Sequence, residues 1–379
     1  MLLEYGVRNF FSFKEGAVVS LRFDGNTPEE ISQGRSCATI MGVNGANAAG
    51  KTQLLKALDF VVWFACRSFS WKPGADMPFE PHGESKEESD FFVEFDIDGI
   101  VYRYEFTAIV GKVLREALYR TKSKKTLLFE RVENRIENAT NEFEALRSLT
   151  LRDNVSVIST ANQYQLLILE DVFSFFNNII TNVYYAGLYE PSGDYNSISA
   201  FLFNVPVILK FLTNFIKSCD TGVEEIVIRQ REGQKGEAVF YPVFVHRIAG
   251  ADYDVSVYEE SSGTKRLFKT LADYFIALDR GSVLVTDEFD LHLHPFILPK
   301  LLDLFTDPDK NKKNAQLIFT SHNSRIMNTL GRYRSCIAVK RDNESFVFRL
   351  DEVSGDLLRN DRPISPVYED GKIGGVPRI

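Results

Sequence analysis

The chain has 379 residues, enough for one large domain or two domains of ordinary size. Its 44 Lys and Arg against 52 Asp and Glu give a formal net charge of −8, which excludes a uniformly basic nucleic-acid coat but leaves room for a local basic patch. With 44% hydrophobic and 25% charged residues, it has the composition of a folded globular protein rather than a disordered one. Four scattered cysteines without a CxxC pair indicate neither a disulfide framework nor a zinc site, and they fit a reducing compartment.

No segment has the length and apolar character of a membrane span. The most apolar stretch, 199–216, is interrupted by asparagines, a lysine and a proline. Glu4 and Arg8 stand where a signal peptide would carry its apolar core. We therefore expect a cytoplasmic protein without a membrane partner.

The N-terminal part is predicted to combine short strands with one helix. Strands are expected over 2–10, 17–23, 37–43, 114–120 and 126–132. A glycine-rich turn follows the third strand and leads into a helix over 51–69, where apolar residues recur at i, i+3 and i+4. Between the helix and the last two strands, Asp98-Gly99 separates two segments of period-two alternation, 93–97 and 102–106, which predicts a hairpin.

The rest of the chain is predicted to begin with a mostly helical region, 141–220, and to alternate strand and helix after it. The later elements are expected, in order, as strands over 225–229, 238–247 and 253–258, a helix over 264–278, a strand over 282–286, a helix over 297–305, and strands over 316–320, 336–340 and 345–350. This alternation favours an α/β fold with a mainly parallel central sheet.

Residues 45–52 match G-x-x-x-x-G-K-[ST] at every fixed position, between an expected buried strand and an expected helix. Gly45 and Gly50 allow the backbone to wrap phosphates closely, and the helix N-terminus supplies positive potential. Lys51 would reach the β- and γ-phosphates of a nucleotide, and Thr52 would hold Mg²⁺ through its hydroxyl. Asn44 and Asn47 belong to the same candidate loop.

The strand expected over 282–286 ends in two acids, Asp287 and Glu288. Adjacent carboxylates at the end of a buried strand need a cation or hydrogen bonds to compensate them. Asp287 therefore suits the Mg²⁺ shell. Glu288 suits polarisation of a water that attacks the γ-phosphate.

Three further motifs lie in the C-terminal part of the chain. Residues 260–265 (ESSGTK) open the helix before the acidic strand, and Ser261, Ser262 and Gly263 there form a candidate second anion site; the plain alternative is a serine that caps its own helix. A Leu-His-Leu-His-Pro run at 291–295 follows the acids, and its two histidines lack a third metal ligand. His322 follows the strand expected over 316–320. A histidine there is usually an ordinary polar residue, but its place after the acids resembles that of the switch histidine of ABC-type ATPases, which senses the γ-phosphate.

Together these motifs resemble the AAA-annotated, ABC-type ATPases related to the SMC, RecF and OLD groups, and most closely the RloA-like ATP-binding proteins of bacterial abortive-infection loci. The resemblance extends to five further stretches: 8–13 (RNFFSF), 77–81 (MPFEP), 102–104 (YRY), 127–131 (LLFER) and 370–377 (DGKIGGVP). Phe11 departs from the pattern, because a basic residue is common there. The glutamine that links Mg²⁺ to the arm in this family is not evident, and Gln163 is our candidate for it.

The resemblance implies a P-loop NTPase of the ABC-ATPase type, with a mainly parallel core sheet, an antiparallel β subdomain and an inserted helical lobe. The expected parts are 1–140 for the first part of the ATPase head, 141–220 for the lobe and 221–379 for the second part of the head. The resemblance also implies ATP and Mg²⁺ as cofactors and an ATP-dependent homodimer or higher oligomer. In that dimer, Ser261 and Gly263 of one chain complete the phosphate loop of the other.

The function expected from the resemblance is that of an ATP-hydrolysing sensor or regulator in an anti-phage defence system. OLD-type relatives fuse a nuclease domain after the ATPase, but only 57 residues follow His322 here, so we expect a separate effector, a nuclease. The alternative is a RecF- or SMC-like DNA repair ATPase that binds duplex DNA through local basic stretches such as 120–125 and 310–313. The nucleotide subunit of a transporter is a third reading, which the inserted lobe argues against.

Overall fold

The computed structural model describes residues 1–189, 194–219, 221–355, 357–358 and 362–376. Pro377, at the end of the motif at 370–377, lies outside the described residues. Among the described residues, no single helix is long and apolar enough to cross a membrane, and the one helix pair that passes the test together is bent by 114°.

The central sheet has six strands and carries the phosphate loop. Its order is β18 (Glu344–Arg349), β17 (Ser335–Arg341), β3 (Ile40–Gly45), β16 (Gln316–Ser321), β15 (Val283–Thr286) and β9 (Ile180–Thr181). All neighbours are parallel except β17 and β18. The carboxyl ends of β3, β16, β15 and β9 therefore meet at one edge, where ligands bind in open parallel sheets. The predicted mainly parallel core is confirmed.

The second sheet has seven strands, all antiparallel, and confirms the predicted β subdomain. Its order is β2 (Ala17–Ser20), β1 (Leu2–Arg8), β4 (Ser89–Ile97), β5 (Ile100–Ile109), β6 (Lys112–Thr121), β7 (Lys125–Val132) and β8 (Arg135–Ala139). Asp98 and Gly99 both have positive φ, as expected of the tight hairpin turn between β4 and β5.

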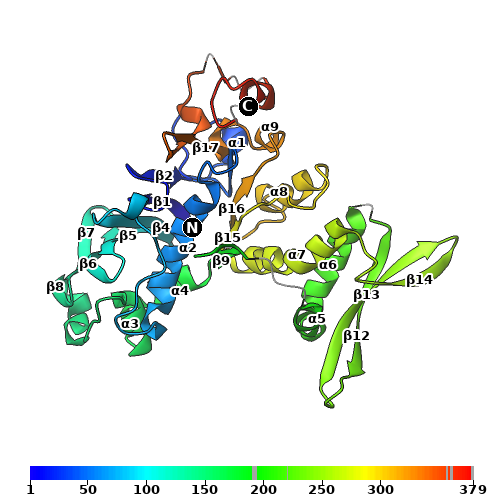
Figure 1. The fold of residues 1–379 in the computed structure, drawn as a ribbon, viewed down its shortest axis with the longest axis horizontal. Coiled ribbons are helices and arrows are strands. Elements are labelled where there is room, and N and C mark those ends of the chain that lie inside the picture. The colour runs from blue at the N-terminus through cyan, green and yellow to red at the C-terminus, as the bar shows by residue number, and fades with distance from the viewer. Residues whose placement is uncertain (190–193, 220, 356, 359–361, 377–379) are drawn as a thin grey trace.

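Helix α2 (Lys51–Arg67) follows the phosphate loop and runs through the middle of the head (Figure 1). Its buried face packs into the main hydrophobic core, in which Phe60 lies among aromatic rings. The ring centroid of Phe60 is 4.9 Å from those of Phe79 and Phe91 and 6.0 Å from that of Phe106. Burial of this aromatic face fixes the helix, and with it the phosphate loop at its N-terminus.

The region 141–220 does not form the single helical lobe that we expected. The 3-10 helix at Asn141–Ser148, α3 (Val157–Gln163) and α4 (Glu170–Asn177) pack into the core that holds α2. The chain then enters the central sheet as β9 and forms a small hairpin, β10 (Val183–Tyr184) and β11 (Gly187–Leu188). Because β9 pairs with β15, it divides the expected lobe into two parts that belong to different cores.

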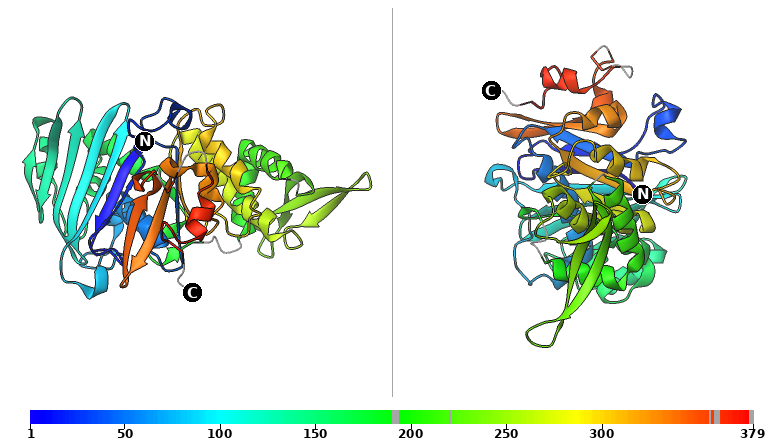
Figure 2. Two further views of the ribbon diagram at one scale, coloured as in Figure 1. Left: turned by 90° about the horizontal axis from the view of Figure 1, so that it is seen from above. Right: turned by 90° about the vertical axis from the view of Figure 1, so that its right-hand side faces the viewer.

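The second part forms a projecting arm with the elements that follow it. Helices α5 (Tyr195–Asn204) and α6 (Pro206–Ser218) share a second core with α7 (Ser262–Arg280) and with the sheet of β12 (Val223–Glu232), β13 (Ala238–Ile248) and β14 (Ala251–Ser256). This core continues onto one face of the central sheet. In Figures 1 and 2, β12–β14 extend away from the two sheets of the head. The remaining helices are short: α1 (Glu29–Ser32), α8 (Leu298–Thr306), α9 (Ile326–Leu330) and α10 (Ser365–Glu369).

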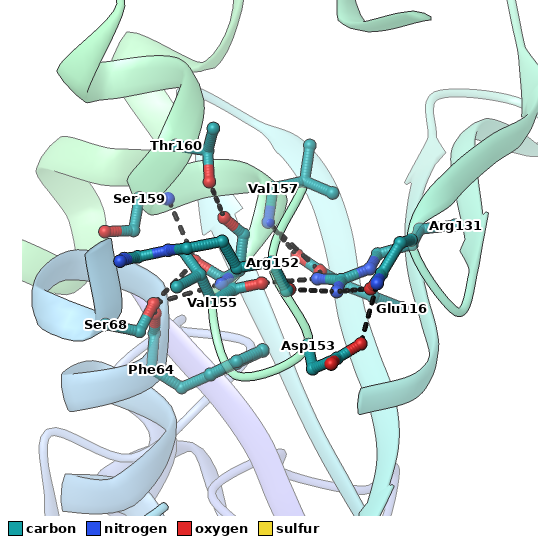
Figure 3. A network of polar contacts seen from close by, with 12 residues as sticks. Phe64, Ser68, Glu116, Arg131, Arg152, Asp153, Val155, Val157, Ser159 and Thr160 are labelled. Atoms are coloured by element: carbon teal, nitrogen blue, oxygen red, sulfur yellow. Dashed lines mark hydrogen bonds and ion pairs between the residues drawn. The ribbon is translucent and has the colours of Figure 1, made fainter. Parts of the chain in front are cut away.

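A fully buried ion pair joins the antiparallel sheet to α3 (Figure 3). Glu116 on β6 and Arg131 on β7 lie 3.2 Å apart. The Glu116 carboxylate also accepts hydrogen bonds from the Tyr104 hydroxyl at 2.8 Å and from the backbone N–H of Val157 at 2.9 Å. The Arg131 guanidinium donates to the carbonyl oxygens of Arg152, at 2.7 Å, and of Val155. The pair thus holds the start of α3 against the sheet.

Candidate nucleotide-binding site

The phosphate loop is shaped by its two glycines. Gly45 ends β3 with φ of +157°, and a Cβ there would lie 2.4 Å from the carbonyl oxygen of Ala338. Gly50 precedes α2 with φ of +99°, and a Cβ there would lie 2.7 Å from the Ser345 hydroxyl oxygen. Both positions therefore require glycine for steric as well as conformational reasons. The loop holds the N-terminus of a 17-residue helix open for an anion.

Lys51 is buried and folded onto the loop. Its ammonium donates hydrogen bonds to the carbonyl oxygens of Gly45 at 2.9 Å and Ala46 at 3.0 Å. Burial lowers the pKa of Lys51, while the carboxylates of Asp287 and Glu288 act in the opposite direction. The charge is thus held inside the cradle, within reach of a phosphate bound to the loop.

Thr52 and Asp287 face one another, as the two motifs predict. The Thr52 hydroxyl donates to Asp287 Oδ2 at 2.8 Å, and the Thr320 hydroxyl donates to Asp287 Oδ1. Asp287 is buried, so its carboxylate is held by two hydroxyls from α2 and β16. A hydroxyl beside a carboxylate at a phosphate loop is the donor set that holds Mg²⁺ together with phosphate oxygens and water. The residues present therefore fit this cation.

Glu288 has the left-handed φ of +50°. Its backbone N–H donates to the Thr320 hydroxyl oxygen at 2.9 Å, and the next residue, Phe289, donates to the Thr320 carbonyl oxygen at 2.9 Å. Among the described residues, no side chain donates a hydrogen bond to the Glu288 carboxylate. An anchored backbone with an unengaged carboxylate suits a group that must bind a water molecule.

Asn182 is the site residue that the sequence reasoning missed. It follows β9, and its side-chain oxygen accepts from the backbone N–H of Asp287 at 2.7 Å, while its amide donates to the Asp287 carbonyl oxygen at 3.2 Å. This double hydrogen bond fixes the end of the acidic strand from the neighbouring strand. The only signal in the sequence is a polar residue after Ile180 and Thr181, which is too short a pattern to predict a strand.

Gln163 is not brought to this site. It ends α3, its side chain is exposed, and Ser159 of the same helix contacts Phe69 beyond the C-terminal end of α2. With a rise of 1.5 Å per residue, that end of α2 lies about 25 Å from Lys51. The amide beside the acidic strand belongs to Asn182 instead, and we propose that Asn182 takes the place we assigned to Gln163.

The candidate signature lies at the same edge of the sheet. Ser261 caps α7, and its hydroxyl oxygen accepts from the backbone N–H of Thr264 at 3.1 Å, so the capping interpretation is confirmed. Ser262 is exposed at the first position of the helix. A Cβ on Gly263 would lie 3.1 Å from the carbonyl oxygen of His292. The signature therefore adjoins the loop that follows Glu288, but no hydrogen bond among the described residues joins it to the chain's own phosphate loop.

The other predicted residues lie in or next to the loop, or directly after the neighbouring strand β16. The Asn44 amide donates to the carbonyl oxygens of Ser321 at 3.1 Å and Asn323 at 3.3 Å, and its buried side-chain oxygen has no partner among the described residues. Asn47 is exposed in the loop. His322 is exposed after β16, and its backbone N–H donates to Asp290 at 3.2 Å. Over the described residues, no group of three His, Cys, Asp or Glu side chains is placed to hold a metal.

Comparison with known proteins supports the motif order. Residues 40–328 match the family model described as "AAA domain, putative AbiEii toxin, Type IV TA system". A solved structure, "Crystal structure of the SmcHead bound to the C-winged helix domain of ScpA", superposes with a TM-score of 0.52 at 12% identity, over 93% of this chain and 99% of that one. A second, "SMC head domain from Thermotoga maritima", gives a TM-score of 0.46 at 14% identity, over 92% and 98%. No curated protein matches the sequence.

These findings bear on the expected architecture. The likeness to the SMC head covers nearly all of both chains, so it shows the fold. The predicted fold, a P-loop architecture of the ABC-ATPase type, is thereby confirmed, and the resemblance to SMC heads is a resemblance of fold. The family match covers the phosphate loop, the acidic strand, the signature and His322.

Proposed function

Because the chain belongs to this family of AAA domains and is an ATPase with an SMC-head-like fold, we propose that it is the ATP-hydrolysing regulatory subunit of a bacterial anti-phage defence system. The family description names a "putative AbiEii toxin" and a "Type IV TA system", which supports the defence setting. We further propose that it acts with a separate effector, a nuclease. We place this activity in the cytoplasm.

The observation that carries the proposal is the set of side chains at one edge of the central sheet. Thr52, Asp287, Thr320 and Asn182 come from four separate elements and are linked by hydrogen bonds around one carboxylate. Packing does not explain the buried carboxylate of Asp287, because an apolar residue would pack better there. It suits a site for a nucleotide with Mg²⁺.

Each residue of the site has a distinct role in hydrolysis. The loop backbone and Lys51 bind the β- and γ-phosphates, which orients the γ-phosphoryl group for in-line attack. Thr52 and Asp287 would hold Mg²⁺, which when bound would neutralise negative charge on the phosphates. Glu288 positions the attacking water and accepts its proton. His322 donates a hydrogen bond toward the γ-phosphate.

A second copy of the chain completes the site. Ser261, Ser262 and Gly263 lie at the same edge of the sheet, without a hydrogen bond to their own loop among the described residues. A helix N-terminus with exposed N–H groups binds phosphate oxygens. Two chains related by a two-fold axis therefore bury two nucleotides between them, and hydrolysis separates the chains.

A phage-challenge experiment tests the proposed function. Cells that express this chain with the product of the adjacent gene are expected to resist phage, and both Lys51→Ala and Glu288→Gln are expected to abolish resistance. Glu237→Gln, in an exposed turn of the arm, is the matched control and should keep it. The two gene products should also co-purify. Full resistance in both site variants would contradict an ATP-driven role in defence.

The alternative is a RecF- or SMC-like ATPase that binds duplex DNA, and one observation favours it. The turn between β6 and β7 exposes Lys122 and Lys124, and Lys125 is exposed at the start of β7. In contrast, Lys310 is paired with Asp303, and Lys313 with Asp279, so the second basic stretch is largely neutralised. ATPase activity that duplex DNA stimulates, with a steep dependence on salt, would select this function over the first.

A further inference from the structure

A hollow of about 780 Å³ lies along α2, beside the nucleotide site. One wall is the flank of α2 from Lys56 to Arg67, and the opposite wall is the segment 179–189 that follows α4. No residue of the phosphate loop lines it. The hollow is therefore a separate recess, which the mechanism of hydrolysis leaves unused.

Exposed aromatic rings surround the hollow. Trp71, Tyr184, Tyr185 and Tyr189 are between 37% and 52% exposed, an uncommon state for four large rings around one recess. Several are held in place: the ring centroids of Tyr184 and Tyr189 are 5.9 Å apart, and the Tyr185 hydroxyl donates to Glu80. Fixed, exposed rings offer flat surfaces on which another planar group can stack.

Three charged side chains on one face of α2 enter the same hollow. Lys56, Asp59 and Arg67 line it, and over the described residues none of these side chains forms a hydrogen bond or ion pair. Lys56 lies 4.7 Å from the centroid of the Phe11 ring, the aromatic residue that replaces the basic one common in related proteins. Burial raises the pKa of Asp59 to about 7, and the nearby Arg67 acts against this rise, so the carboxyl group takes up a proton at a higher pH than an exposed aspartate does.

The spacing of the charges restricts the ligand. Lys56 and Arg67 are eleven residues apart, which is about 16 Å along the helix axis, and Asp59 lies between them. Two cations disfavour a positively charged guest, although an aromatic recess would otherwise suit one. A planar group with hydrogen-bonding edges, flanked by an anion on each side, matches both the rings and the charges.

We propose that this hollow binds a nucleobase of single-stranded nucleic acid, with the base stacked on the tyrosine and tryptophan rings, its edge hydrogen-bonded to Asp59, and the flanking phosphates at Lys56 and Arg67. A free nucleotide has the same chemistry but only one phosphate end to offer. The net charge of −8 is no obstacle, because the contact uses two local cations.

The position of the hollow couples it to the nucleotide site. Thr181, in its wall, directly precedes Asn182, which fixes the backbone of Asp287. Lys56 lies one helical turn after Thr52. A base in the hollow therefore contacts α2, which carries Thr52, and β9, which leads to Asn182. These two elements fix the positions of the Mg²⁺ ligands Thr52 and Asp287.

Tryptophan fluorescence tests the proposal directly, because the only two tryptophans of the chain, Trp63 and Trp71, both line the hollow. The titrants are a short oligothymidylate and thymidine monophosphate, added to the full chain without ATP. We expect both titrants to quench the fluorescence, and we expect the dissociation constant of the oligonucleotide to be at least tenfold lower than that of the mononucleotide. The logarithm of its affinity should fall with the logarithm of salt concentration with a slope of about −1.4, for two phosphates on a single strand.

Variants distinguish oligonucleotide binding in the hollow from binding elsewhere on the chain. Asp59→Ala should weaken oligonucleotide binding about tenfold, because the base edge loses its partner. Lys56→Ala and Arg67→Ala should each reduce the salt slope by about half. Tyr253→Ala, an exposed ring on β14, should leave binding unchanged. Binding by the mononucleotide alone, with the same response to Asp59→Ala, would keep the base site and assign a free nucleotide as its ligand.

The same titration in a Lys51→Ala protein shows whether the base belongs to ATP at the phosphate loop. Quenching that persists supports a separate site, and a thermal unfolding midpoint near that of the wild type verifies that the variant is folded. Two results would overturn the proposal: quenching that disappears with Lys51→Ala, or quenching by neither titrant. The outcome does not depend on hydrolysis, so it stands apart from the test of the proposed function.

Discussion

Glu288→Gln is expected to bind ATP normally and to hydrolyse it about 10²–10⁴-fold more slowly. The glutamine keeps the size of the side chain but cannot accept a proton from the attacking water. The backbone at this position is fixed by two hydrogen bonds to Thr320, so the substitution should not disturb Asp287 or the loop. Phosphate release at saturating ATP gives the rate, and equilibrium binding of ATP gives the affinity.

The trapped nucleotide should also change the oligomeric state. Because the nucleotide is bound between two chains in this account, Glu288→Gln with ATP should accumulate as a dimer in size-exclusion chromatography with light scattering. The Glu237→Gln control should hydrolyse ATP at the wild-type rate and remain in the wild-type distribution. Undiminished steady-state hydrolysis in Glu288→Gln would remove Glu288 from the mechanism.

Arg131→Met is expected to lower the free energy of unfolding by about 3–5 kcal/mol, the largest effect on stability that we expect from any single substitution. The change leaves the Glu116 carboxylate fully buried, with the Tyr104 hydroxyl and a backbone N–H but without its cation. It also removes the donors to the carbonyl oxygens of Arg152 and Val155. Urea unfolding followed by circular dichroism measures the loss.

The cost of Arg131→Met should increase with pH. Burial raises the pKa of Glu116, and Arg131 acts against this rise, so removal of Arg131 raises the pKa further. A carboxyl group with a raised pKa in the folded state destabilises the fold at pH values above that pKa, and the penalty disappears as the pH falls toward the pKa of the unfolded chain. Arg247→Met, at an exposed pair with Asp252, is the control and should change stability little at any pH. Equal losses in the two variants would contradict the role of the buried pair.

The catalytic motifs could be predicted because each is a short local pattern with a fixed chemical reason. Gly45, Gly50, Lys51 and Thr52 lie within eight consecutive residues, and Asp287 directly follows a clearly apolar strand. Their meeting follows from parallel pairing, since the carboxyl ends of parallel strands share an edge. The local motifs and the topology of the parallel sheet therefore predict the same site.

The parts that could not be predicted depend on contacts between distant segments. β9 has two residues, and it is a strand only because β15 lies beside it. Without β9, the aromatic and helical patterns of 141–220 predicted one lobe. Gln163, at the end of α3, was our candidate for the site, and the sequence reasoning did not consider Asn182. The burial of the Glu116–Arg131 pair could not be predicted either, because a Glu–Arg pair on two strands is usually a surface pair.

A mixing experiment tests most directly whether two chains share each nucleotide site. Lys51→Ala disables the phosphate loop of its own chain, and Ser261→Arg blocks the signature that the chain offers to its partner. Each variant alone should be inactive. In an equal mixture, the mixed dimers contain one intact site, and about a quarter of the wild-type sites should be restored. A mixture as inactive as its components, with mixed dimers shown to form, would contradict a site completed by the partner chain.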